Sequence, residues 1–385
     1  MRPVLIGTVL LSIAAAYYIY LPLPSTISEP WKLINTTYLF FSQSFLAHDL
    51  GLTSPFGLAK YYSAGAKSIE SSPSVRVTEA CFGGVEALVF ESAAAGQEQS
   101  FKRGVFIVLY IQLHMISYCH SKVRITSSPR FTKRYNDVFQ ASKHILTSEV
   151  LGRYSIDLKR VAVSGDSAGG NLAAAVAQQV ALDSSIPIKF KVQALVYPAL
   201  QALDFNTPSY QQNANMPILD RPMMARFWLE YLNGEQKLVP ALLANNHTAL
   251  DQGQEIAAAK AKTDWTKLLP VAFQKSYKPV FPLHGDPKLL EKLPGLLDVR
   301  AAPLLAETKV LKAVPPAYIM TCEHDVLRDD GLMYATRLEE AGVDVTVDHF
   351  EDGFHGCLSF AFGPFAFSVG RRSLGNYIHW LKENL

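Results

Sequence analysis

Apolar runs alternate with stretches of helical spacing along most of this chain of 385 residues. Continuous apolar runs of about four to eight residues are typical of strands buried on both faces of a sheet. Such runs occupy residues 105–111, 160–163, 192–197 and 317–322, and a further strand is predicted at 343–349. Helical patterns lie between them, at 137–151, 171–183 and 330–341. This alternation predicts an α/β fold with a mostly parallel, doubly wound sheet.

Two regions depart from that alternation. Two strand-like runs, residues 75–79 and 85–90, flank Gly83-Gly84, which predicts a β-hairpin. Residues 201–300 hold few strand-like runs, several prolines and aromatic-rich helical pieces such as 223–231. We interpret them as a cap inserted above the sheet that bounds an apolar pocket; an extra structural subdomain is the competing interpretation.

The N-terminus predicts a membrane anchor. Val4 to Leu23 is a run of about 20 residues without a charge, long enough to cross a bilayer, and tyrosines lie near its end. A cleaved signal peptide is the alternative, but Pro22-Leu23-Pro24-Ser25 is a poor cleavage site. We therefore expect a signal-anchor helix over 1–24 and one folded domain over 25–385, outside the cytosol in either case.

Two glycosylation motifs agree with a location outside the cytosol, and the composition bears on metals and nucleic acid. The sequons Asn35-Thr36-Thr37 and Asn246-His247-Thr248 predict glycosylation at Asn35 and Asn246. The four cysteines lack the paired Cys-x-x-Cys spacing of a structural zinc site, so we expect no metal, and we expect no cofactor. A formal net charge of +2, with no basic cluster, gives no reason to expect a nucleic-acid partner.

The most informative motif is residues 161–170, which read Val-Ala-Val-Ser-Gly-Asp-Ser-Ala-Gly-Gly and lead into a strong helix former. A strand, a Gly-x-Ser-x-Gly turn and a helix are the context of a nucleophile elbow. The turn exposes the hydroxyl of Ser167, and the amide of Ala168 at the helix N-terminus faces developing negative charge. Ser167 is thus the candidate nucleophile and Ala168 the candidate oxyanion donor.

A serine nucleophile needs a base, and the base needs a carboxylate to orient it. In sheet-built hydrolases the chain order is Ser, then Asp or Glu, then His, each in a loop after a strand. Asp325 follows the strand at 317–322, and His355 lies in the glycine-flanked loop after the strand at 343–349. The competing acids are Glu323, Asp329 and Asp330, and the competing histidines are His324 and His349.

These motifs resemble the arylacetamide deacetylases, in the hormone-sensitive-lipase-like branch of the α/β-hydrolase family. The resemblance rests on 165–171 (Gly-Asp-Ser-Ala-Gly-Gly-Asn), on the Asp325 loop and on 352–356 (Asp-Gly-Phe-His-Gly). It extends to Tyr197-Pro198, to 297–305 and to the closing 380–385. It implies an α/β-hydrolase fold in which Ser167 is the nucleophile, Asp325 the orienting acid and His355 the general base.

The resemblance also implies an activity and a location. Such enzymes are membrane-anchored carboxylesterases facing the endoplasmic reticulum lumen. They cleave esters, aryl acetamides and sometimes neutral lipids through an acyl-serine intermediate. The family places a cysteine just after its glycine-rich loop, near Cys119 here, and a disulfide between Cys119 and Cys322 is the corresponding hypothesis.

One family feature is missing. The His-Gly-Gly-Gly that follows the strand at 105–111 in the family is replaced by 112–119, and no glycine occurs between Gly104 and Gly152. Loss of those amides costs roughly a hundredfold to a thousandfold in turnover per donor. The chain is therefore an impaired enzyme, an inactive relative or a variant product of a normal gene. The second hypothesis for its function is a catalytically inactive, membrane-anchored protein that binds apolar ligands.

Overall fold

The computed structural model describes residues 23–37, 71–92, 102–108, 130–249, 253–286, 288–363 and 365–385. Its strands are β1 (Val75–Phe82), β2 (Val85–Ser92), β3 (Lys102–Val108), β4 (Ile156–Asp166), β5 (Val192–Val196), β6 (Ala317–His324) and β7 (Val345–Phe354). Strands β3 to β7 pair in chain order and all run parallel. The predicted parallel α/β sheet is confirmed.

Helices cover both faces of this sheet, because successive side chains of a strand point to opposite faces. On one face Val163 and Leu195 pack with α7 (Ala168–Leu182) and α16 (Arg328–Glu340). On the other face Val196 and Met320 pack with α17 (Ser368–Asn384) and α2 (Pro30–Thr37). The sheet is therefore doubly wound, and its central strands are apolar on both faces.

The edge strand β3 differs from its prediction. The apolar run at 105–111 predicts burial on both faces, yet Val105 is 39% and Ile107 51% exposed. In the part of the chain that the structure describes, β3 is the first strand of the sheet and pairs with β4 alone. Val105 and Ile107 lie on the same face of the strand, and the described residues leave that face exposed, although hydropathy alone predicts a central strand.

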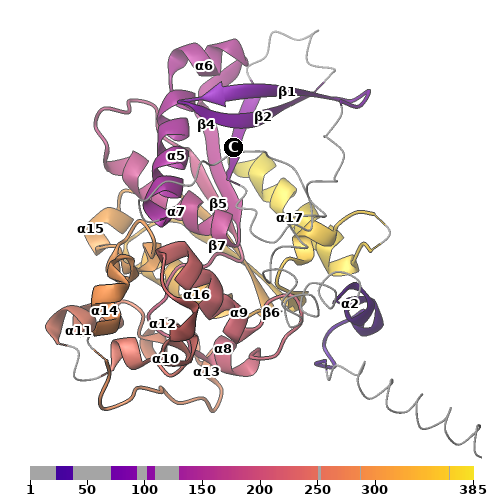
Figure 1. Ribbon diagram of the computed structural model, residues 1–385. Coiled ribbons are helices and arrows are strands. Elements are labelled where there is room, and N and C mark those ends of the chain that lie inside the picture. The colour runs from indigo at the N-terminus through magenta and orange to yellow at the C-terminus, as the bar shows by residue number, and fades with distance from the viewer. Residues whose placement is uncertain are drawn as a thin grey trace, which may run out of the picture.

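The predicted hairpin is also confirmed. β1 and β2 pair antiparallel around Gly83 and Gly84, both of which have positive φ. The helix predicted at 137–151 is divided into α5 (Arg130–Ile145) and α6 (Ser148–Arg153), because Thr147 accepts a hydrogen bond from the backbone of Val150 and starts a new helix. The hairpin packs against α5 (Figure 1).

Residues 201–300 contain helices and turns but no strand among the described residues. Their elements are α8 (Pro208–Gln212), α9 (Arg221–Leu232), η3 (Gln236–Leu238), α10 (Val239–Leu243), η4 (Asn246–Thr248), α11 (Gln254–Ala261), α12 (Trp265–Leu268), α13 (Val271–Gln274), α14 (Lys288–Lys292) and η5 (Pro294–Leu297). The turns η6 (Pro303–Leu305) and η7 (Cys357–Phe360) and the helix α15 (Thr308–Leu311) complete the described elements. The insertion gathers at the end of the molecule opposite the hairpin (Figure 1). Its apolar side chains form a cluster that includes Val326 and Leu327, next to Asp325.

No helix within the described ranges is long and apolar enough to span a bilayer. The anchor predicted at 1–24 lies outside those ranges except for its last two residues.

The close approach of β4 and α7 predicts a steric effect at Gly165. A Cβ there would lie 2.2 Å from the carbonyl oxygen of Gly169, which is backbone and cannot move away cheaply. We expect Gly165→Ala to lower the free energy of unfolding by about 1–3 kcal/mol. Gly152 in α6 is the matched control, because a Cβ there meets nothing within 4 Å. Gly152→Ala should be neutral or stabilise slightly. Equal urea unfolding curves for the two variants would contradict this packing.

Candidate active site

Ser167 lies in the turn between β4 and α7. Its φ of 54° is in the left-handed region, which is strained for a serine. Two backbone hydrogen bonds fix the turn to the chain that follows β5: Ser167 N donates to the carbonyl of Val196 at 2.9 Å, and its own carbonyl accepts from Ala199 N at 3.3 Å. The strained turn is thus held by the neighbouring strand, and the serine side chain is only partly buried.

His355 connects Ser167 to Asp325. Its Nε2 lies 3.0 Å from Ser167 Oγ, and its Nδ1 lies 2.8 Å from Asp325 Oδ2. A carboxylate only accepts hydrogen bonds, so Nδ1 carries the proton and Nε2 is the acceptor for the serine hydroxyl. His355 is 6% and Asp325 0% exposed, so the pair is shielded from water. The structure brings these three predicted residues together in the order that general-base activation of a serine requires.

The loop that carries Asp325 is fixed from two sides. Asp325 Oδ1 accepts a hydrogen bond from Leu327 N at 2.9 Å, which leaves Oδ2 for His355. The side-chain amide of Asn213, just after α8, donates to the backbone carbonyls of Glu323 and Asp325 at 3.0 and 3.1 Å. The insertion therefore contributes to the position of the carboxylate.

The alternative acids have other partners. Asp329 accepts from Ser209 N at 2.6 Å and pairs with Arg328 at 2.9 Å. Asp330 accepts from Leu200 N at 2.8 Å and from the side chain of Gln201 at 2.9 Å. Burial raises the pKa of Asp330 to about 7 despite these hydrogen bonds. Neither carboxylate is bonded to His355.

Glu323 belongs to a charged cluster beside Asp325. Arg328, with 0% of its side chain exposed, donates to Glu323 and to Asp329, and Lys275 pairs with Glu323 from the outer side. Burial works against ionisation of Glu323, but a hydrogen bond from His349 and the charge of Arg328 hold its pKa well below the usual range. Glu323 is therefore an ionised structural partner of Arg328.

The alternative histidines are also engaged elsewhere. Nδ1 of His349 lies 2.9 Å from the Thr321 hydroxyl, and its Nε2 lies 3.5 Å from Glu323. Nε2 of His324 lies 2.7 Å from the hydroxyl of Thr26, which belongs to the N-terminal segment. Neither is hydrogen-bonded to Ser167.

Two neighbours of His355 were missed by sequence reasoning. The ring of Tyr197 lies 4.9 Å from the imidazole, centroid to centroid, and Tyr197 has a positive φ of 35°. Burial raises the pKa of Asp166, next to the nucleophile, while the charge of His355 lowers it. The pair Tyr197-Pro198, at the end of the predicted strand, was named in the sequence only for its family resemblance, because the contact with His355 depends on β5 and β7 reaching the same sheet edge.

Other predicted site residues are placed as follows. Ala168 is the first residue of α7, where its N–H has no acceptor within the helix. The segment 112–119, which replaces the glycine-rich loop, lies outside the described residues. Asn35 is exposed in α2, whereas Asn246 is half-buried in η4. Among the described residues no group of three His, Cys, Asp or Glu side chains could hold a metal ion.

Cys322, which we expected to pair with Cys119, is a free thiol in the structure. Its sulfur lies 3.7 Å from that of Cys357, two residues beyond the triad histidine. Burial and the neighbouring thiol raise the pKa of Cys322 well above the usual value, so it stays protonated. Cys119 itself lies outside the described residues.

Comparison with known proteins gives consistent matches over nearly the whole chain. A family model described as the alpha/beta hydrolase fold matches residues 124–267 and 289–359. The chain is 48% identical to neutral cholesterol ester hydrolase 1 of Mus musculus, over 96% of this chain and 97% of that protein. It is 38% identical to arylacetamide deacetylase of Oryctolagus cuniculus, over 99% and 100% respectively. A thermostable esterase from Pseudomonas putida shares the fold, with a TM-score of 0.56 at 22% identity over 86% of this chain and 89% of that one.

The buried cluster around Arg328 predicts a stability difference between two arginines. Arg328→Met leaves the buried carboxylate of Asp329 without its cation and leaves Glu323 with Lys275 alone, so it should lower the free energy of unfolding by about 3–5 kcal/mol. Arg300, which pairs with Asp298 and keeps 42% of its side chain exposed, is the control. Arg300→Met should cost less than about 1 kcal/mol. Urea unfolding at pH 7 measures both. A loss below about 1 kcal/mol for each variant would show that the cluster does not hold the acid loop.

Proposed function

The chain belongs to the α/β-hydrolase family, among the relatives of neutral cholesterol ester hydrolase and arylacetamide deacetylase, and we propose that it hydrolyses carboxylic esters and aryl acetamides through an acyl-serine intermediate. That it is a carboxylesterase-like hydrolase follows from these relatives. The observation that supports the mechanism is the pair of hydrogen-bond distances, 3.0 and 2.8 Å, linking Ser167 to His355 and His355 to Asp325.

The proposed reaction has two halves. Ser167 Oγ attacks the substrate carbonyl carbon while its proton passes to His355 Nε2, and the resulting imidazolium is stabilised by Asp325. When the tetrahedral intermediate collapses, the leaving alcohol or amine takes that proton and the acyl group remains on Ser167. Water then repeats the sequence: His355 takes a proton from the water, and the carboxylic acid leaves as Ser167 regains its hydrogen.

The proposed oxyanion donor is the N–H of Ala168. It lies at the N-terminus of a helix of 15 residues, whose dipole favours the negative charge that develops on the carbonyl oxygen. Each further donor lost with the glycine-rich loop would lower turnover by roughly a hundredfold to a thousandfold. We therefore expect this chain to be a slower enzyme than a relative that retains those glycines.

The proposed substrates are small and apolar, including neutral lipid esters. This proposal is supported by the relatives, which are named for cholesterol ester and arylacetamide substrates, and by the apolar insertion cluster that reaches the Asp325 loop. A membrane would supply such substrates. We propose that the uncharged run from Val4 to Leu23 anchors the chain in the endoplasmic reticulum membrane with the catalytic domain in the lumen, as a single-pass protein.

Labelling of the nucleophile tests the proposed mechanism. A fluorophosphonate probe should label the full-length protein, and Ser167→Ala should abolish both labelling and hydrolysis of p-nitrophenyl butyrate. Ser164→Ala is the matched control, because Ser164 lies on the same strand and its hydroxyl bonds to the Ala194 carbonyl. That variant should still be labelled. If Ser167→Ala hydrolyses the ester as fast as the parent, the mechanism is wrong; ligand binding without turnover would favour the inactive binding protein.

Glycosylation tests the proposed lumenal orientation. Asn35 is exposed, so we expect it to carry a glycan, and Asn35→Gln should reduce an endoglycosidase-H-sensitive mass shift by one glycan in protein made with microsomes. Asn246 is half-buried, and Thr248 of its sequon is buried and donates to the Leu203 carbonyl at 2.9 Å, so glycosylation there must precede folding. A protein with no glycan at either site would contradict the lumenal placement.

A further inference from the structure

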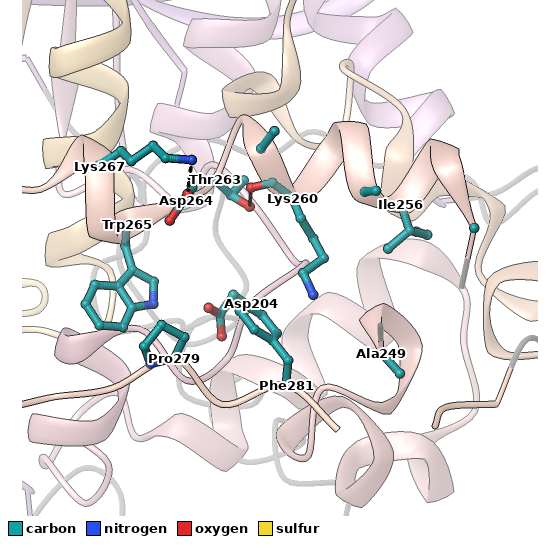
Figure 2. A pocket seen from close by; sticks show the side chains of 13 residues that line it. Asp204, Ala249, Ile256, Lys260, Thr263, Asp264, Trp265, Lys267, Pro279 and Phe281 are labelled. Atoms are coloured by element: carbon teal, nitrogen blue, oxygen red, sulfur yellow. Dashed lines mark hydrogen bonds and ion pairs between the residues drawn. The ribbon is translucent and has the colours of Figure 1, made fainter. Parts of the chain in front are cut away.

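A cavity lies within the insertion, and no residue of the triad lines it. It has a volume of about 330 Å³ and lies between α11, α12 and the segment 279–281 (Figure 2). None of the residues that line it belongs to the triad or to the turn around Ser167. Its volume falls within the range of sites for small ligands, which run from about 300 to 1,000 Å³.

An unpartnered buried carboxylate oxygen lines this cavity. Asp204 is 3% exposed, and its Oδ1 accepts hydrogen bonds from Asn206 N at 2.7 Å and from the side chain of Asn245 at 2.8 Å. No described residue hydrogen-bonds its Oδ2. Burial raises the pKa of Asp204, while Asn245, Asn206 and the charge of Lys260 lower it. The carboxylate is thus held firmly by one oxygen and has the other available.

An unpartnered donor lines the same cavity. Trp265 is 2% exposed, and its indole Nε1 has no hydrogen-bond partner among the described residues. Figure 2 shows the Asp204 carboxylate between this indole and the ammonium of Lys260. Lys260 is already engaged, because it donates to the Thr248 carbonyl at 3.0 Å and lies 3.4 Å from the ring centre of Phe281.

Apolar walls are contributed by Ile256, Ala257, Pro279 and the ring of Phe281. The other charged groups of the lining, Asp264 and Lys267, pair with each other at 2.7 Å, so their charges offset one another. A carboxylate ligand would be repelled by Asp204. An ammonium ligand would lie near the charge of Lys260 and could not accept from Trp265, because it has no free acceptor. A hydroxyl oxygen both donates and accepts, which matches the two unpartnered groups.

We propose that this cavity is a binding site for a neutral alcohol with a compact apolar body, whose hydroxyl donates to Asp204 Oδ2 and accepts from Trp265 Nε1. The apolar body lies against Phe281 and Pro279. No triad residue lines this cavity, so a test of alcohol binding here is independent of any test of the hydrolase mechanism.

The test uses full-length protein with Ser167→Ala, in which the triad is inactive, labelled with ¹⁵N in its four tryptophan indoles. The Trp265 signal is identified by its loss in Trp265→Phe. Benzyl alcohol should shift that signal saturably. It should bind about tenfold more tightly than toluene, which lacks the hydroxyl, or benzylamine, which is a cation.

Two further variants separate the polar contact from general packing. In Asp204→Asn the amide oxygen still accepts from Asn206 and Asn245, but a donor replaces the available acceptor, so affinity for benzyl alcohol should fall about tenfold. Lys267→Met is the control, because Lys267 lies at the rim and its side chain is 78% exposed in its pair with Asp264. Its affinity should not change.

Several outcomes would overturn the proposal. Equal affinity for toluene would make the cavity a purely apolar one, and tighter binding of benzylamine would make it an amine site. A Trp265 signal that does not respond to any probe would mean that internal water alone fills the cavity. The comparison of the three probes in the parent protein decides the matter even if Asp204→Asn fails to fold.

Discussion

The hydrogen bond between Asp325 and His355 is the interaction on which the site depends. It fixes the proton on Nδ1 and directs Nε2 at Ser167, and both partners are shielded from water. The geometry arises because β4, β6 and β7 are parallel and end at the same edge of the sheet. Residues more than 150 positions apart in the chain therefore meet within a few ångströms.

Much of the surrounding polar structure serves to hold that pair. Asn213 binds the backbone on both sides of His324 in the acid loop, and Arg328 neutralises the carboxylates of Glu323 and Asp329 beside it. The insertion therefore helps to position the carboxylate of Asp325. A change there can alter the orientation of His355 without touching the substrate, because a misplaced carboxylate misplaces the imidazole.

The sequence was sufficient for the local parts of the fold and the site. The strand, the glycine-spaced turn and the helix around Ser167 are contiguous, so their pattern predicts the elbow directly. The choice of Asp325 among the acids at 323–330 was harder, because it depends on Asn213, Ser209 and Gln201, which lie more than a hundred residues earlier. The exposed face of β3 was likewise not predictable, since hydropathy does not reveal what covers a strand.

The most direct test of the account compares two carboxylates near His355. Asp325→Asn should lower kcat/KM for p-nitrophenyl acetate by about a thousandfold to ten-thousandfold, because the imidazole loses the partner that sets its tautomer. Asp352→Asn, which weakens a partly exposed pair with Arg372 and an exposed hydrogen bond from Ser28, should leave it nearly unchanged. If both variants keep most of the parent activity, Asp325 does not orient His355 and the account is wrong.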